Sequence, residues 1–185
     1  MCPQQVLGAV LFHSRGWIWH CLNGMHLNRN RLMKGGFDFN MDYQFYGWEH
    51  ADAPAVSKEY EGIRTPKDLY DALSDIWCGY TCAPRMRGNW SRENRTLGQC
   101  SITAFLAQDI FGGKVYGILR EGGNYHCYNV VGDCIFDLTS EQFGDEVLSY
   151  ENNPEQFREV HFAKEEKRER YEYLWAVVKN RLGKI

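Results

Sequence analysis

The sequence lacks the features that mark several common classes of protein: a long hydrophobic run, an excess of basic charge, and any internal repeat or low-complexity segment. The longest apolar run near the N-terminus, residues 6–12, is broken by Gly8 and is too short to span a membrane. The formal net charge of −3 gives no reason to expect a phosphate backbone as partner. We therefore expect neither a membrane nor a nucleic acid as a partner.

The cysteines do not follow the pattern of a secreted disulfide protein. The chain has seven of them, an odd number, and its first residues lack a basic start followed by a continuous apolar run. Both observations favour a cytoplasmic protein with reduced thiols.

The composition predicts a folded chain, because hydrophobic residues make up 44% of it and aromatic residues 15%. Residues 1–60 show little periodicity apart from an alternation at 37–41 that predicts a short strand. We expect them to form an N-terminal extension, and residues 61–185 to form a single α+β domain. The sequence patterns become clearer after Met33. This also raises the hypothesis that residues 1–32 are an over-called start, that is, residues wrongly assigned to the native protein because the start was placed too far upstream.

One stretch, residues 96–113, reads as a buried helix with Cys100 in its first turn. Apolar residues cover most of its circumference, so the helix belongs inside the domain. Gly112 and Gly113 predict its C-terminal stop, because glycine adopts the left-handed conformation that ends helices. A thiol in the first turn lies near unpaired backbone N–H groups and the positive end of the helix dipole, which favour the thiolate.

The remaining elements follow from local signals. Thr65, Pro66 and Asp68 predict the start of an amphipathic helix that continues to about residue 79. Strands are expected at 114–120, 125–131 and 134–138, joined by short glycine-containing turns into an antiparallel meander, and a charged helix at 164–182.

Cys100, His126 and Asp137 stand in the order of helix, second strand and third strand. A thiolate nucleophile needs a nearby base, and that base needs a partner on its far nitrogen to fix its tautomer and orientation. If Val131 pairs with Cys134 across the turn, Asp137 reaches His126 diagonally on the same face of the sheet. Acyl transfer also needs donors for the developing oxyanion, and the candidates are the backbone N–H of Cys100 and the side-chain amides of Gln99 and Asn94.

This order of residues resembles the core of papain-like enzymes, including the NlpC/P60 and transglutaminase-like branches. A more specific resemblance, over roughly residues 66–182, is to the YunG-like bacterial family, which has no established substrate. It is carried by Trp90, Asn94, residues 96–100, the stop at 111–113, residues 126–129 and residues 137–143. The papain-like resemblance implies a central helix packed on an antiparallel sheet and a Cys-His-Asp arrangement.

Structural interpretations of the same residues stand beside the catalytic one. Cys100 can be an inert buried thiol, His126 a core histidine bonded to a carbonyl, and Asp137 the cap of the turn at 139–140. A set of four zinc thiolates, Cys78, Cys82, Cys127 and Cys134, has irregular spacing and is the weaker alternative. The arginines at 85, 87, 92 and 95 form either a solvated rim, which we favour, or a site for an anionic substrate.

The sequence thus predicts a cysteine-dependent hydrolase or acyltransferase that acts on an amide or thioester substrate without a metal or cofactor. In this hypothesis Cys100 is the nucleophile, His126 the base and Asp137 its orienting partner. The alternative is a non-catalytic binding module of papain-like fold that uses an apolar patch at residues 37–48 as its contact surface.

Overall fold

The structure is a computed structural model, and it describes residues 45–60 and 62–182. The strand expected at 37–41 and the over-called start expected at 1–32 lie outside the described residues. The described residues form helices and a small antiparallel sheet, so the fold class is α+β.

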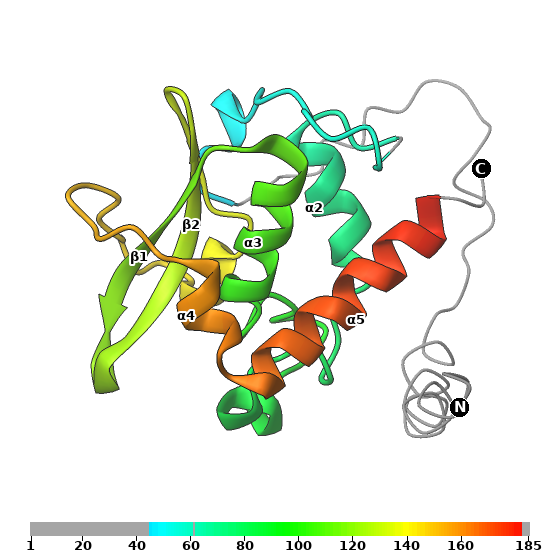
Figure 1. The fold of residues 1–185 in the computed structure, drawn as a ribbon. Helices are drawn as coiled ribbons and strands as arrows, with labels where there is room; N and C mark the ends of the chain where they lie inside the picture. Colours follow the sequence, from blue (N-terminus) through cyan, green and yellow to red (C-terminus); the bar gives the residue numbers. More distant parts are fainter. Residues whose placement is uncertain (1–44, 61, 183–185) are drawn as a thin grey trace, which may run out of the picture. The chain divides into compact units, whose positions relative to one another are not determined.

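Helix α3, Cys100–Phe111, is the central element (Figure 1). Ile102, Leu106 and Ile110 are fully buried in the main core, whereas Phe105 points to a second cluster on the sheet. Burial on both sides explains why the helix is apolar nearly all round. The helix ends at Gly112, which has a φ of 73°, as the glycine pair predicts.

The sheet has the order β1-β2-β3 and is antiparallel throughout. Its strands are β1 (Lys114–Arg120), β2 (Asn124–Val131) and β3 (Cys134–Phe136), and a 3₁₀ turn at Glu121–Gly123 joins the first two. The expected register is confirmed, because Val131 pairs with Cys134 and Asn129 with Phe136.

The third strand is shorter than expected. It ends before Asp137, because the Asp137 backbone N–H donates to the Tyr46 carbonyl oxygen at 3.0 Å instead of continuing the pairing with β2. The segment before the first described helix thereby reaches the sheet and lies next to the end of β3.

Helix α2, Pro66–Ser74, begins where the sequence predicts. The Thr65 hydroxyl accepts from the Asp68 N–H at 3.4 Å and the Asp68 carboxylate accepts from the Thr65 N–H at 3.1 Å, which is a capping box. The helix is shorter than the expected span to residue 79, because Ile76 and Trp77 both donate to the Leu73 carbonyl and close its last turn.

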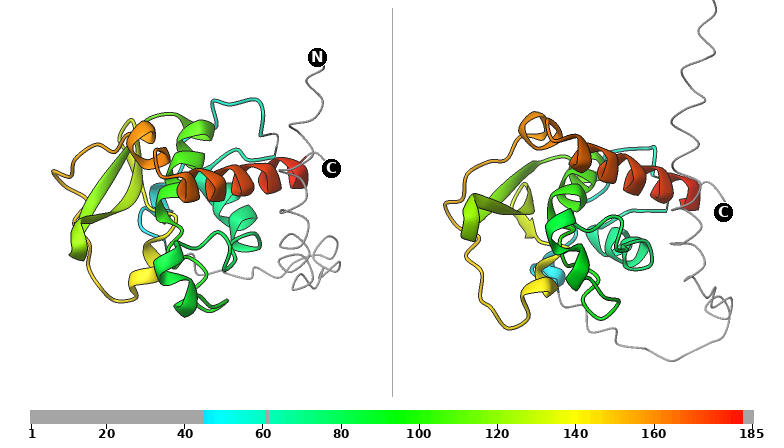
Figure 2. Two further views of the ribbon diagram at one scale, coloured as in Figure 1. Left: turned by 60° about the horizontal axis from the view of Figure 1, so that its bottom comes forward. Right: turned by 90° about the horizontal axis from the view of Figure 1, so that it is seen from below.

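Helix α5, Glu165–Leu182, matches the expected C-terminal helix, and a short helix α4, Arg158–Phe162, precedes it. Leu174 and Val178 of α5 are fully buried, whereas Trp175 keeps 36% of its surface exposed. The views in Figures 1 and 2 show α3 between the sheet on one side and α2 and α5 on the other. The N-terminal end of α3 is thus held between packed layers.

Residues 45–60 are part of the same core as the elements that follow them. Phe45, Ala51 and Tyr60 are buried in the main cluster, and the Val56 N–H donates to the Ile110 carbonyl oxygen at 2.8 Å. The expected boundary at residue 60 therefore falls inside the packed region.

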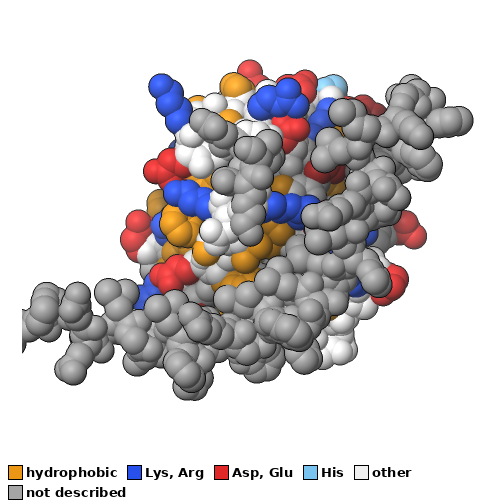
Figure 3. Space-filling model, turned by 90° about the vertical axis from the view of Figure 1, so that its right-hand side faces the viewer, with side chains coloured by type: hydrophobic (Ala, Val, Ile, Leu, Met, Phe, Trp, Pro, Cys, Tyr) orange, Lys and Arg blue, Asp and Glu red, His pale blue; other side chains and the backbone are white. Residues whose placement is uncertain are grey.

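The surface in Figure 3 carries acidic and basic side chains interspersed among hydrophobic ones where the described residues are visible. Within the described part of the chain, every helix is too short or too polar to cross a membrane.

Candidate functional site

Cys100 is the first residue of α3 and is partly exposed. Its Sγ lies 4.0 Å from the carbonyl oxygen of Tyr125, which places the thiol beside the start of β2. Among the described side chains none caps this end of the helix, and Gln99 stands at the cap position in a helical conformation. The first backbone N–H groups of α3 therefore have neither an intrahelical acceptor nor a side-chain cap.

His126 lies on β2, in the central strand of the sheet, and is 2% exposed. Its Nε2 is 2.5 Å from Oδ2 of Asp137. The other ring nitrogen, Nδ1, is buried and has no hydrogen-bond partner within the described region. The hydrogen bond at Nε2 thus holds the imidazole in place, whereas Nδ1 remains available for a hydrogen bond.

Asp137 is fully buried and both of its oxygens are used. Oδ1 accepts from the Thr139 N–H at 3.0 Å and from the Thr139 hydroxyl at 3.1 Å, whereas Oδ2 accepts from the Tyr150 hydroxyl at 3.0 Å as well as from His126. The turn-capping role and the orienting role therefore belong to the same carboxylate.

The electrostatics of the site favour a charged pair. A hydrogen bond with the Cys127 side chain lowers the pKa of Cys100 well below its usual 9.0; burial acts against this, and the neighbouring His126 side chain adds to the lowering. Burial alone lowers the pKa of His126, but the charge of Asp137 and its hydrogen bond outweigh burial and raise it from 6.5 to about 10. The two shifts act in the direction of a thiolate at Cys100 and an imidazolium at His126.

Phe143 covers His126. Its ring lies edge-on to the imidazole with centroids 4.6 Å apart, and it ends the 3₁₀ helix Ser140–Phe143 that follows Asp137. The Arg120 guanidinium lies 4.8 Å from the centre of the Phe143 ring and is held by two 2.8 Å hydrogen bonds to Glu146. This cover keeps the histidine–carboxylate pair away from bulk water, which strengthens their interaction.

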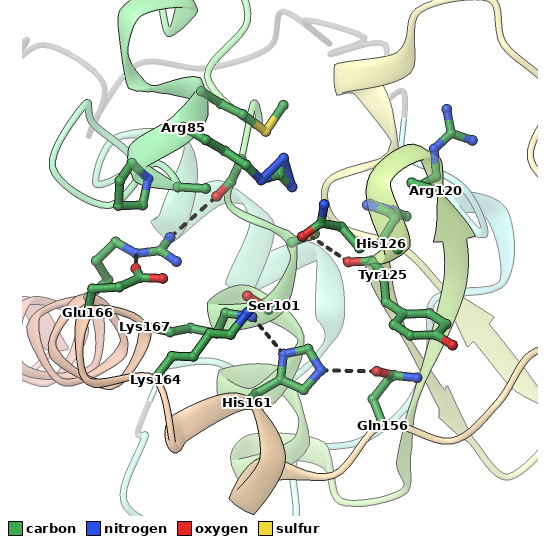
Figure 4. A pocket seen from close by; sticks show the side chains of 18 of the residues that line it. Arg85, Ser101, Arg120, Tyr125, His126, Gln156, His161, Lys164, Glu166 and Lys167 are labelled. Atoms are coloured by element: carbon green, nitrogen blue, oxygen red, sulfur yellow. Dashed lines mark hydrogen bonds and ion pairs between the residues drawn. The ribbon is translucent and has the colours of Figure 1, made fainter.

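A cavity of about 780 Å³ opens in front of Cys100 and His126. Its walls are the 3₁₀ helix Pro84–Asn89, the first turn of α3, the turn between β1 and β2, and residues of α4 and α5 (Figure 4). This volume is ample for a small-molecule or peptide acyl group.

The amides of Gln99 and Asn94 are not among the described residues that line this cavity. The Gln99 side chain is fully buried and its Nε2 donates to the Cys78 carbonyl oxygen at 3.3 Å. Asn94 lies in the preceding loop, where its backbone N–H donates to the Ser91 hydroxyl at 3.2 Å. The structure thus brings Cys100, His126 and Asp137 together but leaves these two amides apart from them.

The alternative zinc set is not assembled. Cys82 donates to the Ala83 carbonyl at 3.5 Å, Cys134 donates to the His50 carbonyl at 3.2 Å, and Cys127 lies beside Cys100. Over the described ranges, no group of three or more potential metal-binding side chains comes together.

The arginines of the loop before α3 occupy two kinds of position. Arg87 donates to the carbonyls of Tyr80 and Cys82, and Arg95 to the carbonyl of Ser74, so these side chains brace the backbone. Arg85 lines the cavity.

Sequence reasoning missed several residues of the site. Phe143 and Thr139 lie within the 137–143 segment but carry no chemical signal of their own, and Tyr150 lies in a loop without periodicity. His161 lines the cavity from α4 and Lys167 from α5, a segment for which the sequence predicts only a charged helix. Only the fold brings these residues to the site.

The comparisons with known proteins agree with the resemblance found in the sequence. The model of the family described as YunG protein matches residues 65–183, a span that contains Cys100, His126 and Asp137. The uncharacterized protein YunG of Bacillus subtilis (strain 168) is 34% identical over 85 residues, which cover 46% of this chain and 70% of that protein. No solved structure matches the chain. Since the family model covers more than half of the chain, this protein belongs to the YunG family.

Proposed function

We propose that this protein is a cysteine-dependent hydrolase or acyltransferase with a papain-like core, acting on an amide or thioester bond. The observation that carries the proposal is the buried His126–Asp137 pair, with 2.5 Å between Nε2 and Oδ2. His126 lines the same cavity as Cys100, and its Nδ1 has no hydrogen-bond partner among the described residues. Nucleophilic catalysis by a cysteine needs a histidine beside the thiol and a carboxylate that orients the histidine ring. Here a buried histidine bonded to a carboxylate lies beside a cysteine at the start of a helix.

In the first step the Cys100 thiolate attacks the carbonyl carbon of the substrate, and a carbon–sulfur bond forms as the carbonyl oxygen becomes an oxyanion. Collapse of this intermediate breaks the bond to the amine or thiol leaving group, to which the His126 imidazolium gives its proton. The products are an S-acyl Cys100, a neutral imidazole and the free leaving group.

In the second step neutral His126 takes a proton from a water molecule or from an acceptor amine or thiol, which attacks the S-acyl carbonyl. The carbon–sulfur bond then breaks and Cys100 leaves as a thiolate beside imidazolium, which restores the starting state. Water gives hydrolysis and another acceptor gives transfer. Asp137 keeps Nε2 engaged throughout, so that Nδ1 exchanges the proton.

We assign the oxyanion to the backbone N–H groups at the start of α3 instead of to Gln99 or Asn94. These N–H groups belong to Cys100 and Ser101, which both line the cavity, and they lack a side-chain cap within the described structure. Uncapped N–H groups at a helix start are suitable donors to a developing negative charge.

The test is the pH dependence of alkylation at each cysteine by iodoacetamide, read by peptide mass spectrometry, in the native protein and in His126→Gln. At about pH 6, Cys100 should react faster than the other cysteines. In His126→Gln its rate at that pH should be at least about tenfold lower. Cys134, which is partly exposed and pairs with Val131 at the other end of β2 from His126, is the internal control. If Cys100 instead titrates like a free thiol near about 8.5, the non-catalytic binding module becomes the better interpretation.

A further inference from the structure

The lining of the cavity is cationic although the chain as a whole carries a net charge of −3. Of its basic side chains, Arg120 is paired with Glu146 and Arg170 with Glu166. The three that remain, Arg85, Lys164 and Lys167, form no ion pair with any carboxylate of the described residues. Figure 4 shows them on the side of the cavity opposite His126.

Lys167 is the one of the three that the structure holds in place. Its Nζ is 3.0 Å from Nδ1 of His161, whose Nε2 is 3.0 Å from Oε1 of Gln156 (Figure 4). Burial and the neighbouring Lys167 charge lower the pKa of His161 to about 4, so the ring is neutral. Nδ1 of the neutral ring therefore accepts one hydrogen from the Lys167 amine, which has further N–H groups to donate.

Gln156, at the far end of this chain of hydrogen bonds, is fixed by the sheet. Its backbone N–H donates to the Val115 carbonyl at 2.8 Å and its Nε2 to the Pro154 carbonyl at 3.2 Å. A Cβ on Gly117 of β1 would lie 2.7 to 2.8 Å from the Gln156 side chain, so the glycine makes the room that this side chain occupies. His161 is 8% exposed, which fixes the orientation of the ring as well.

Lys167 is thus a partly buried basic side chain that lines the cavity, bonds to a neutral ring and forms no ion pair with a carboxylate of the described residues. Burial lowers its pKa, and the charge of the cysteine pair at the site acts in the opposite direction, so the ammonium is within electrostatic range of Cys100. A cation removed from water without a carboxylate paired to it gains when an anion enters the same space.

We propose that the cavity binds acyl substrates that carry a carboxylate, and that Lys167 is the residue that binds this group, with Lys164 and Arg85 adding to the positive field. The inference rests on the proposed function, since it names the substrate class of the same site. His161 and Gln156 act as positioning residues for the lysine.

The experiment compares the alkylation of Cys100 by iodoacetate and by iodoacetamide, which have nearly the same size and differ in charge. A change in the thiolate fraction alters both rates equally, so the ratio of the rates reports recognition of the anion alone. In the native protein we expect the ratio at Cys100 to exceed the ratio at Cys134 by about tenfold. The charge of His126 also attracts iodoacetate. Variants of Lys167 therefore decide which residue causes the preference for iodoacetate.

Lys167→Met should lower the ratio at Cys100 by about fivefold or more, whereas Lys167→Arg should retain most of it because the charge remains. The matched control is Lys179→Met on the same helix α5, which removes a lysine paired with Glu59 outside the cavity and should leave the ratio unchanged. Thermal melting of each variant establishes that it is folded.

The outcomes separate the two proposals. If Cys100 reacts rapidly with both reagents and Lys167→Met leaves the ratio unchanged, the anion inference is overturned and the nucleophile stands. If neither reagent modifies Cys100, the proposed function falls, and the substrate class inferred from it falls too.

Discussion

Nε2 of His126 lies 2.5 Å from Oδ2 of Asp137, and each side chain is at most 2% exposed. The carboxylate is itself held by Thr139 at one oxygen and by Tyr150 at the other. An imidazole fixed in this way cannot rotate without breaking a buried charged hydrogen bond. Its other nitrogen, Nδ1, therefore keeps one direction.

The first prediction concerns Asp137→Asn. The amide keeps the size of the side chain but removes the charge that raises the pKa of His126, so the alkylation rate of Cys100 at about pH 6 should fall at least about tenfold. Tyr150→Phe, which removes one hydrogen bond to the same oxygen, should cost about 1 kcal/mol of stability and change the rate less than about threefold. Unchanged reactivity in Asp137→Asn would mean that this residue only caps its turn.

The second prediction concerns stability against pH. His126 has a folded-state pKa of about 10 against an ordinary 6.5, so its contribution is fully present below 6.5 and is lost as pH rises through 10. Cys100 has the opposite sign, because its lowered pKa gives a contribution that is present above 9.0 and is lost as pH falls. As pH rises from 6.5 to 9.0, the stability lost through His126 and the stability gained through Cys100 therefore nearly cancel.

The measurement is urea unfolding of the native protein and of the double variant Cys100→Ser, His126→Gln. The difference in unfolding free energy should stay nearly level from about pH 7 to about pH 8.5 and should shrink as pH rises through about 10. A difference that already declines steeply from about pH 7 would indicate a neutral thiol beside the charged histidine.

The third prediction separates Gln99 from the oxyanion site. Gln99→Leu should lower the unfolding free energy by about 1 kcal/mol, because it removes one hydrogen bond to the Cys78 carbonyl, which keeps the Thr81 hydroxyl and the Cys82 N–H as donors. Acylation of Cys100 by 4-nitrophenyl acetate forms an oxyanion, whereas alkylation by iodoacetamide does not. The ratio of these two rates should change less than about threefold, since the structure turns the amide away from the cavity.

The comparison variant is Gln108→Leu, on the same helix, which removes a partly exposed amide from the Gly113 carbonyl. It should leave both rates unaltered. A loss of about a hundredfold in acylation alone, in Gln99→Leu, would restore Gln99 as an oxyanion donor.

Local patterns predicted the centre of this site because each of its parts has a local cause. The apolar residues of α3 and the Gly112 stop define the helix, the short turn before Cys134 sets the register, and alternation then directs Asp137 towards His126. Each of these signals depends on residues that are close together in the chain, so it can be recognised in the sequence.

The opposite wall of the cavity has no such local cause. Lys167 reaches the site through α5, and its orientation depends on His161, Gln156 and the missing side chain of Gly117, which contact one another only in the folded chain. The five-residue helix α4 is likewise too short to produce a periodic pattern. Long-range packing also explains why β3 ends early, since Tyr46 replaces β2 as the partner of Asp137.

The fourth prediction tests how firmly the end of α3 is held against the sheet. Gly113 has a φ of +71°, and a Cβ there would lie 2.2 Å from the Val130 carbonyl oxygen; Gly123 has a φ of +73° and no atom of the described structure within 4 Å of its Cβ position. Alanine at either position carries the strain of the left-handed conformation, about 1–2 kcal/mol, so the difference between them isolates the clash. Gly113→Ala should lower the unfolding free energy in urea by at least about 2 kcal/mol more than Gly123→Ala. Equal losses would show that the turn after α3 can move away from β2, and the alkylation rate of Cys100 in Gly113→Ala would then report whether the start of the helix moves with it.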